Sequence, residues 1–303
     1  MKSPVVTVFG ATGFLGREIC QALVEEGWIV RLAARQPNRV LLSGIPRDRS
    51  ERVAVDIRRR PEVARALEGA AAAVNAVSLY VQSRKLRFED VHVRGAAAIA
   101  ECAREQGVDR LVHISGIGVD PQSPSAYVRA RAQGEQAVRE AFAGATVLRP
   151  SVLFGPGDAF VSNLVKIARL PAVPLFGRGQ TRLQPAFVED VAEAVNVALH
   201  RPDSTGRVYE LGGGQVLTYR EAVTAVMKEL GVRRPLMPVP FVFWKLIAAL
   251  LRPLPNPPLT RDQVVLMATD NIAGSEIPGF ADLELEARRF DQALTMCLKS
   301  VFS

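Results

Sequence analysis

Short runs of apolar residues alternate with segments of helical period through the first two-thirds of the chain. The apolar runs predict strands over 4–9, 29–34, 52–56, 71–77, 110–115 and 145–149. The helical periods predict helices between them, over 14–26, 61–68, 88–106 and 126–141. Strands separated by helices of this length pair in parallel through right-handed crossovers, and helices cover both faces of the sheet. The pattern therefore predicts an α/β fold with a doubly wound parallel sheet, the Rossmann arrangement.

Prolines change the pattern after position 150 and break the chain into short pieces, which we expect to lie above the carboxyl edge of the sheet. A further helix over 190–199 and a strand over 207–211 are predicted to return to the sheet. Thr218 and Glu221 have the spacing of a capping box at a helix start. We therefore expect two parts: a Rossmann domain formed by 1–155 and 178–213, and a smaller C-terminal lobe formed by 156–177 and 214–303.

Three glycines join the first strand to the first helix, at positions 10, 13 and 16. Backbone N–H groups at such a helix start face a pyrophosphate, and the glycines let the two backbones approach closely. The alternative is a tight strand–helix turn in an unrelated α/β domain. The residues predicted to contact a dinucleotide share this turn: Gly10, Thr12, Gly13, Phe14, Leu15, Gly16 and Arg17.

The end of the second strand indicates which dinucleotide is bound. An NAD site commonly has an acidic residue here, which bonds the ribose hydroxyls. This chain has none over 30–36 and offers Arg35 instead, with Arg39 nearby and Arg17 after the third glycine. Guanidinium groups suit a 2′-phosphate, so the corner predicts NADP(H) unless these are ordinary surface arginines. Asp56, after the third strand, either bonds the adenine amine or caps its own turn.

Composition and charge limit the partners, metals and cellular locations that the chain is expected to have. The 303 residues carry 38 basic and 31 acidic side chains, a net charge of +7, which favours anionic partners. The arginines of 47–60 alternate with acidic residues and lack interleaved aromatics, so they predict a solvated surface and no nucleic-acid partner. The three scattered cysteines have no metal-like spacing, and no metal site is expected. We expect neither a signal peptide nor a spanning helix, and the cytoplasm is the default location.

Three further segments carry a family resemblance. Tyr127-Val128-Arg129-Ala130-Arg131 stands where a Tyr-x-x-x-Lys motif is expected. Arg149-Pro150-Ser151-Val152-Leu153-Phe154-Gly155 looks like the segment that passes the nicotinamide, and Phe187-Val188-Glu189-Asp190 like the start of the next helix. With the glycine turn, these segments resemble the extended and atypical branches of the short-chain dehydrogenase/reductase superfamily.

Segments 91–96, 113–118 and 259–264 carry a narrower resemblance. They are similar to the family of the NADPH-binding accessory subunit of respiratory complex I, alpha subcomplex subunit 9, and its bacterial relatives. The resemblance covers nearly the whole chain. It implies NADP(H) as the cofactor and a respiratory complex as a partner.

The superfamily resemblance implies roles for Tyr127, Arg131 and Ser115. In catalytic members the tyrosine is the general acid/base, the lysine holds the ribose and lowers the pKa of the tyrosine, and a serine polarises the substrate. Arg131 keeps the positive charge, but its planar fork does not reproduce a compact ammonium. The usual serine position falls near Ile117, so Ser115 is either catalytic or a core or cofactor-contacting hydroxyl.

The remaining cofactor contacts implied by the resemblance come from two strand ends. They are Asn75, Val77 and Ser78 after the fourth strand, and Pro150, Ser151 and Val152 after the sixth. Ser115, Tyr127 and Arg131 are expected to contact the cofactor as well. His92 and His113 are expected to be packed side chains, and Asp190 a helix N-cap.

Residues 240–252 form the most apolar helical candidate of the chain. It is too short to span a bilayer, but Trp244, Lys245 and Arg252 suit an anchor for an interfacial helix at a membrane surface or a respiratory complex. The alternative is a buried helix of the smaller lobe. The interfacial form implies a cytoplasmic protein that is peripheral on the inner face of a membrane.

The hypothesis these features favour is an NADP(H)-binding protein with an accessory or assembly role linked to respiratory complex I or quinone metabolism, with the nucleotide held structurally. One alternative is an NADPH-dependent oxidoreductase that reduces a small hydrophobic carbonyl or alkene, with Tyr127 as the acid. A weaker alternative is a sugar-nucleotide epimerase or dehydratase, which needs an intact Tyr-x-x-x-Lys pair.

Overall fold

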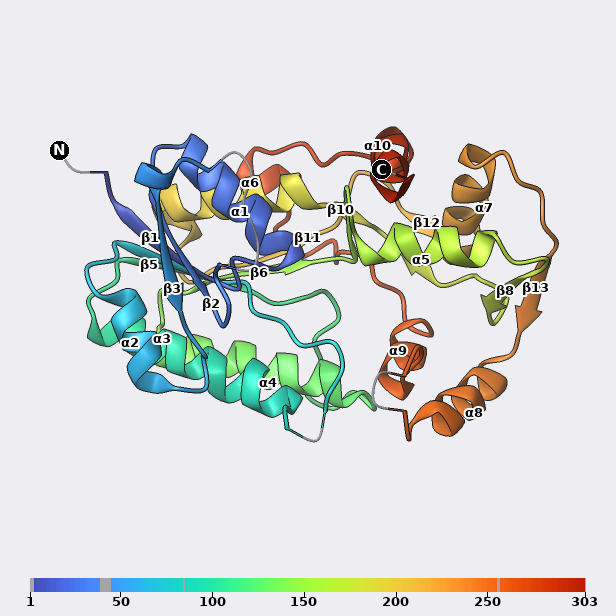
Figure 1. The fold of residues 1–303 in the computed structure, drawn as a ribbon, viewed down its shortest axis with the longest axis horizontal. Coiled ribbons are helices and arrows are strands. Elements are labelled where there is room, and N and C mark those ends of the chain that lie inside the picture. The colour runs from blue at the N-terminus through green and yellow to red at the C-terminus, as the bar shows by residue number, and fades with distance from the viewer. Residues whose placement is uncertain (1–2, 39–44, 84, 255–256, 303) are drawn as a thin grey trace.

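Seven parallel strands form the central sheet of the protein, seen in a computed structural model that describes residues 3–38, 45–83, 85–254 and 257–302 (Figure 1). The strand order is β11-β6-β5-β4-β1-β2-β3, and every neighbouring pair is parallel. The strands are β1 (Val5–Phe9), β2 (Ile29–Ala34), β3 (Ser50–Ala54), β4 (Ala72–Asn75), β5 (Arg110–Ile114), β6 (Thr146–Pro150) and β11 (Val208–Leu211). The doubly wound parallel sheet predicted from the hydrophobic pattern is therefore confirmed.

Helices cover both faces of this sheet (Figure 1). On one face α1 (Phe14–Glu25) packs against α6 (Val188–His200), and their apolar sides share a core with Val8 and Val30. The other face is covered by α2 (Arg60–Leu67), α3 (Ala96–Glu105) and α4 (Ala126–Ala141). The helix predicted over 88–106 is a π-helical turn (Glu89–Gly95) that continues into α3.

The start of α6 corrects one prediction. The helix begins at Val188, and its N-cap Phe187 provides no side-chain bond. Asp190 is therefore inside the first turn, where its carboxylate accepts the backbone N–H of Arg288 at 2.7 Å. The prediction that Asp190 is the N-cap is wrong, because the carboxylate holds the 288 segment instead of its own helix end.

The chain beyond the sheet packs around a second core. Its members include Phe154, Leu175, Tyr219 and Phe290, all of them buried. Thr218 and Glu221 form the predicted capping box. The helices of this region are α5 (Ala159–Ala168), α7 (Tyr219–Glu229), α8 (Phe241–Leu251), α9 (Arg261–Leu266) and α10 (Phe290–Phe302). Short 3-10 turns occupy Arg47–Arg49, Pro202–Ser204 and Ala281–Leu283.

Three two-stranded pairs connect these helices to the sheet. Their strands are β7 (Leu153–Phe154), β8 (Val173–Phe176), β9 (Arg182–Leu183), β10 (Ala186–Phe187), β12 (Leu217–Thr218) and β13 (Leu236–Val239). They pair as β10 with β7, β12 with β9, and β13 with β8. The boundary predicted between a Rossmann domain and a smaller lobe stays a prediction.

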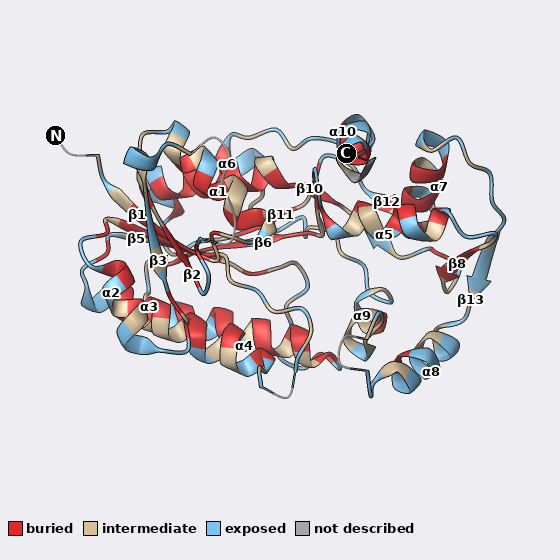
Figure 2. Cartoon of the chain, viewed as in Figure 1, coloured by how far each residue is buried: buried red, intermediate tan, exposed pale blue. Residues whose placement is uncertain are grey.

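The helix α8 is exposed along most of its length, unlike the helices beside the sheet (Figure 2). The helices beside the sheet turn one side inward, whereas Ala248 is the only buried residue of α8. The alternative of a buried lobe helix over 240–252 is therefore wrong. None of the helices in the described ranges combines the length and apolarity that crossing a bilayer requires.

Candidate functional site

The turn between β1 and α1 leaves no room for side chains. Gly10 has a φ of +85°, and a Cβ there would lie 2.8 Å from the carbonyl oxygen of Ala76. A Cβ on Gly16 would lie 2.1 Å from the carbonyl oxygen of Gly10. The N–H of Gly13 donates to that same oxygen at 2.9 Å. The turn therefore needs glycine at positions 10 and 16, because backbone atoms occupy the space of a side chain.

The first turn of α1 suits an anion. Its N-cap Gly13 provides no capping side chain, and the turn contains no acidic residue. Arg17, one turn later, has a buried Nε with no hydrogen-bond partner. Unpaired N–H groups at a helix start favour a phosphate, and the unpaired Nε–H of Arg17 is a further donor for an anion. The residues at this turn therefore fit the pyrophosphate of a dinucleotide.

The corner after β2 carries the residues predicted to choose the nucleotide. Ala34 ends the strand, and Arg35 is exposed directly after it. Arg39 lies outside the described residues. Asp56 accepts the backbone N–H of Arg58 at 3.1 Å and its Nε at 2.9 Å. These bonds, with a smaller contribution from the charge of Arg35, lower the pKa of Asp56. Asp56 thus forms the turn, and its contact with adenine stays a prediction.

Tyr127 and Arg131 lie one turn apart on α4 and are both buried. A guanidinium N–H of Arg131 donates to the phenol oxygen of Tyr127 at 3.2 Å and to Oγ of Ser78 at 3.3 Å. The guanidinium carbon is 5.4 Å from the centre of the tyrosine ring. The spacing of four residues therefore places the two side chains together on one face of α4. This face points toward the segment that follows β4, which contains Ser78.

Aromatic rings enclose Tyr127. The ring centres of Phe88, His92 and Tyr80 are 5.4, 5.5 and 5.8 Å from its own. His92 is buried, and its Nε2 lies 3.0 Å from the carbonyl oxygen of Leu79. Burial first, and then the charge of Arg131, lowers the pKa of His92 to about 4. We call Ser78, Phe88, His92, Tyr127 and Arg131 the Tyr127 cluster.

His113 is the second buried histidine near this edge. Its Nδ1 is 3.1 Å from the amide nitrogen of Asn75 on the neighbouring strand. Burial lowers the pKa of His113 to about 3, with smaller contributions from Arg131 and His92. Both histidines are packed, neutral side chains at pH 7, as predicted.

Ser115 follows β5 and is 2% exposed. Its hydroxyl oxygen has no hydrogen-bond partner. Gly116 comes next, and a Cβ there would lie 3.2 Å from a guanidinium nitrogen of Arg131. Ile117 then donates its backbone N–H to the carbonyl oxygen of Pro150, and its side chain has no polar atom. An unpaired buried hydroxyl fits a ligand contact, but the role of Ser115 stays a prediction.

The polar groups at two other strand ends already have partners. Asn75 accepts the N–H of Val77 at 3.2 Å. The hydroxyl of Ser151 and the N–H of Val152 both donate to Oδ1 of Asn271, at 2.7 and 2.8 Å. Pro150 ends β6 beside them. Contacts of these residues with a cofactor stay predictions, since Asn271 occupies two of the expected donors.

Sequence reasoning did not find Asn271 or Asp262. Asp262 of α9 accepts the hydroxyl of Ser125 at 2.6 Å and the N–H of Tyr127 at 3.4 Å. Each contact joins residues more than a hundred positions apart, 120 for Ser151 with Asn271 and 135 for Tyr127 with Asp262. No local pattern signals a polar contact of that range.

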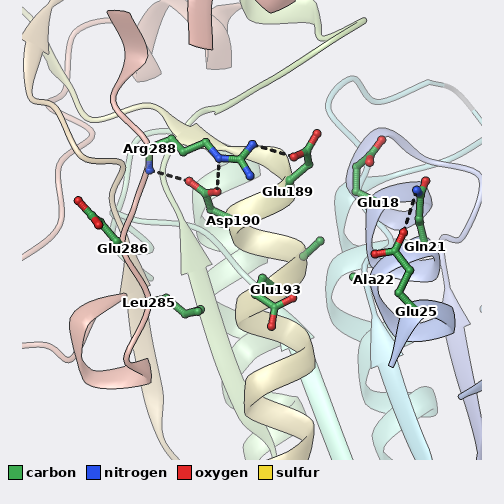
Figure 3. A pocket seen from close by; sticks show the side chains of 11 residues that line it. Glu18, Gln21, Ala22, Glu25, Glu189, Asp190, Glu193, Leu285, Glu286 and Arg288 are labelled. Carbon is green, nitrogen blue, oxygen red and sulfur yellow. Dashed lines mark hydrogen bonds and ion pairs between the residues drawn. The ribbon is translucent and has the colours of Figure 1, made fainter. Parts of the chain in front are cut away.

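A pocket of about 500 Å³ lies elsewhere, between α1, α6 and the 285–288 segment (Figure 3). Its lining is mostly acidic, and Arg288 pairs there with Glu189 and Asp190. Burial and the nearby Glu189 raise the pKa of Glu18. None of the predicted nucleotide or catalytic residues lines this pocket. The described residues hold no group of three or more His, Cys, Asp or Glu arranged to bind a metal ion.

Comparison with known proteins identifies the family to which this sequence is similar. Residues 6–212 match the model of the NAD dependent epimerase/dehydratase family. The chain is 32% identical to NADH dehydrogenase [ubiquinone] 1 alpha subcomplex subunit 9, mitochondrial, of Arabidopsis thaliana, over 93% of this chain and 74% of that one. It is 35% identical to the ceramide reductase of Caulobacter vibrioides, over 62% of this chain and 58% of that one.

Solved structures agree on the fold. A dTDP-glucose 4,6-dehydratase of Streptomyces venezuelae with NAD and TYD bound has a TM-score of 0.75 to this chain. The two share 20% sequence identity, over 98% of this chain and 96% of the other. At this identity the likeness concerns only the arrangement of helices and strands.

Proposed function

Because this chain belongs to the NAD dependent epimerase/dehydratase family, we propose that it binds NADP(H) and holds the nucleotide without turning it over. Its role is that of an accessory or assembly protein linked to respiratory complex I or quinone metabolism. The observation that carries the proposal is the contrast between a complete glycine turn at 10–16 and a site with Arg131 and Ile117 at its expected lysine and serine positions. The similarity to chains named as complex I subunits supports the accessory role.

The preference for the phosphorylated nucleotide rests on charge. No acidic residue directly follows β2, so the position that commonly bonds the ribose hydroxyls of NAD carries no carboxylate to repel a 2′-phosphate. Arg35 is exposed there, and Arg17 keeps a buried Nε without a partner beside the glycine turn. Charge-assisted bonds to phosphate are about twice as strong as neutral ones, so two guanidinium groups favour NADP(H) over NAD(H).

When bound, the nicotinamide supplies hydride chemistry; the residues of this chain decide whether that chemistry is used. Arg131 donates N–H groups to both Tyr127 and Ser78. A guanidinium has donors but no acceptor, so it does not take the place of a lysine in passing a proton to Tyr127. Ile117 offers no hydrogen bond to a substrate carbonyl. The site thus orients and shields a nucleotide, but it lacks two of the groups that would move a proton.

A second candidate function follows from the same contact. An N–H of Arg131 donates to the phenol oxygen of Tyr127 at 3.2 Å, so the tyrosine has a cationic hydrogen-bond donor where the resemblance expects a lysine. With this arrangement the protein would be an NADPH-dependent reductase of a small hydrophobic carbonyl or alkene, with Tyr127 as the acid. Similarity to a chain named ceramide reductase supports this alternative.

Native purification tests the proposal. The protein is isolated without added nucleotide, denatured, and the released nucleotide is identified by chromatography and mass. We expect NADPH or NADP+ close to one per chain. Recovery of NAD(H) instead would contradict the assignment of the nucleotide. Oxidation of the bound NADPH by a carbonyl would favour the reductase.

A further inference from the structure

The helix α8 exposes a continuous apolar stripe. Leu250, Val242 and Leu246 are 71%, 65% and 56% exposed, and Phe243 and Ile247 are exposed beside them. Positions 242, 243, 246, 247 and 250 lie on one side of a helix, because 3.6 residues complete a turn. An exposed apolar surface of this extent marks an interaction site more often than a chance feature of a monomer.

The opposite side of α8 is fixed to the protein, so the stripe cannot turn inward. The indole N–H of Trp244 donates to the carbonyl oxygen of Leu175 at 3.1 Å. The rings of Trp244 and Phe241 both contact Phe176, with centres 4.4 and 6.4 Å away. Trp244 was expected to anchor an interfacial helix, and that expectation is wrong, because its ring lies on the inner side. The outer side is purely aliphatic apart from Phe243.

The charges of the chain segment that contains the stripe have one sign. The segment 231–261 contains five basic residues and no acidic one. All five side chains are exposed: Arg233, Arg234, Lys245, Arg252 and Arg261. Lysine and arginine lay their methylene stems along an apolar surface while the charge stays in water. Such an arrangement is complementary to a layer of acyl chains covered by anionic headgroups.

We propose that α8 docks the protein on a lipid bilayer with anionic headgroups, helped by Lys245 on the helix, Arg252 at its end and Arg261 at the start of α9. With 11 residues, α8 lies along the surface and inserts its stripe into the boundary between headgroups and acyl chains. The stripe fits lipid better than protein, because protein interfaces enrich tyrosine, tryptophan and hydrogen-bonding groups at their centres. Its outward residues have no side-chain hydrogen-bonding group.

The docking surface is joined to the Tyr127 cluster through α9, which packs beside α8. Asp262 of α9 holds the start of α4 through the hydroxyl of Ser125 and the N–H of Tyr127. Docking therefore holds the Tyr127 cluster close to the membrane. A bound nucleotide beside the cluster would then also lie close to the membrane, and only this last consequence rests on the proposed function.

Flotation with phosphatidylcholine vesicles, with and without phosphatidylglycerol, tests the docking. We expect the wild-type protein to float with the anionic vesicles. Leu246→Glu and Leu250→Glu should each reduce binding more than about tenfold, because each buries a charge at the boundary and adds repulsion. Met296→Glu is the control, since Met296 is also an exposed helical residue, 48% exposed on α10. Lys245→Gln should weaken binding roughly fivefold.

Two results would overturn the docking proposal. One is a wild-type protein that stays unbound with anionic vesicles, and the other is Leu246→Glu floating as the wild type does. If the protein does not bind vesicles but comigrates with a large membrane protein in detergent, the partner of the α8 stripe is a protein, and the lipid docking proposal is contradicted. The affinity for NADPH is measured on the same samples. If it is absent while flotation is intact, the proposed function fails and the docking stands.

Discussion

The glycine turn and the Tyr127 cluster meet at the same edge of the sheet but obey different constraints. The turn is fixed by backbone contacts, since a Cβ on Gly16 would lie 2.1 Å from a carbonyl oxygen. The cluster is fixed by side chains, and its key contact is a 3.2 Å bond from Arg131 to Tyr127. Binding a nucleotide needs only the glycine turn. Reacting with it also needs groups that move a proton, and the chain has Arg131 and Ile117 at the positions where a lysine and a serine are expected.

The largest expected effect comes from the glycine turn itself. Gly16→Ala places a methyl group against backbone that cannot move aside, and we expect a loss of about 3 kcal/mol in the free energy of unfolding. NADPH binding should be lost with it. Urea unfolding and calorimetric titration measure the two effects. Gly274→Ala is the control, because a Cβ there meets its nearest atom at 3.5 Å. Equal behaviour of the two variants would refute the close-approach argument.

Acid tests the burial of two histidines, His92 in the Tyr127 cluster and His113 near it. His92 and His113 have pKa values lowered to about 4 and about 3, so they stay neutral in the folded protein below pH 6.5. The unfolded chain binds those protons, so stability should fall as the pH drops from 6.5 toward 4, by up to about 1.4 kcal/mol per pH unit for each histidine. Above pH 7 this contribution should be flat.

Urea unfolding over this pH range measures the slope. His113→Gln should make the curve shallower, whereas His200→Gln, at an exposed histidine, is the control. A slope unchanged by His113→Gln would mean that His113 is open to water.

A smaller effect is expected at the corner after β2. Arg35→Ala should weaken NADPH binding about tenfold, because one charge-assisted bond to the 2′-phosphate is lost. NADH binding should hardly change. Arg139→Ala, an exposed arginine at the far end of α4, is the matched control. Equal losses for both nucleotides would remove the argument for NADP(H).

The two regions also differ in how far the sequence predicts them. The turn is local: strand, glycines and helix follow each other within 5–25, and the spacing of Tyr127 and Arg131 is one helical turn. Asn271 and Asp262 reach the site only through tertiary packing, so no periodicity reveals them. The side chain of Trp244 faces inward because Phe176 and Leu175 lie beneath α8, which the composition of the helix does not specify.

The central claim is that NADPH is held without reacting, and mixing the NADPH-loaded protein with carbonyl and quinone compounds tests it most directly. The absorbance of the bound dihydronicotinamide is followed over time in the wild type and in Tyr127→Phe. We predict that the signal persists equally in both proteins. Rapid oxidation in the wild type that slows in Tyr127→Phe would contradict the claim and make the Tyr127 cluster an active site.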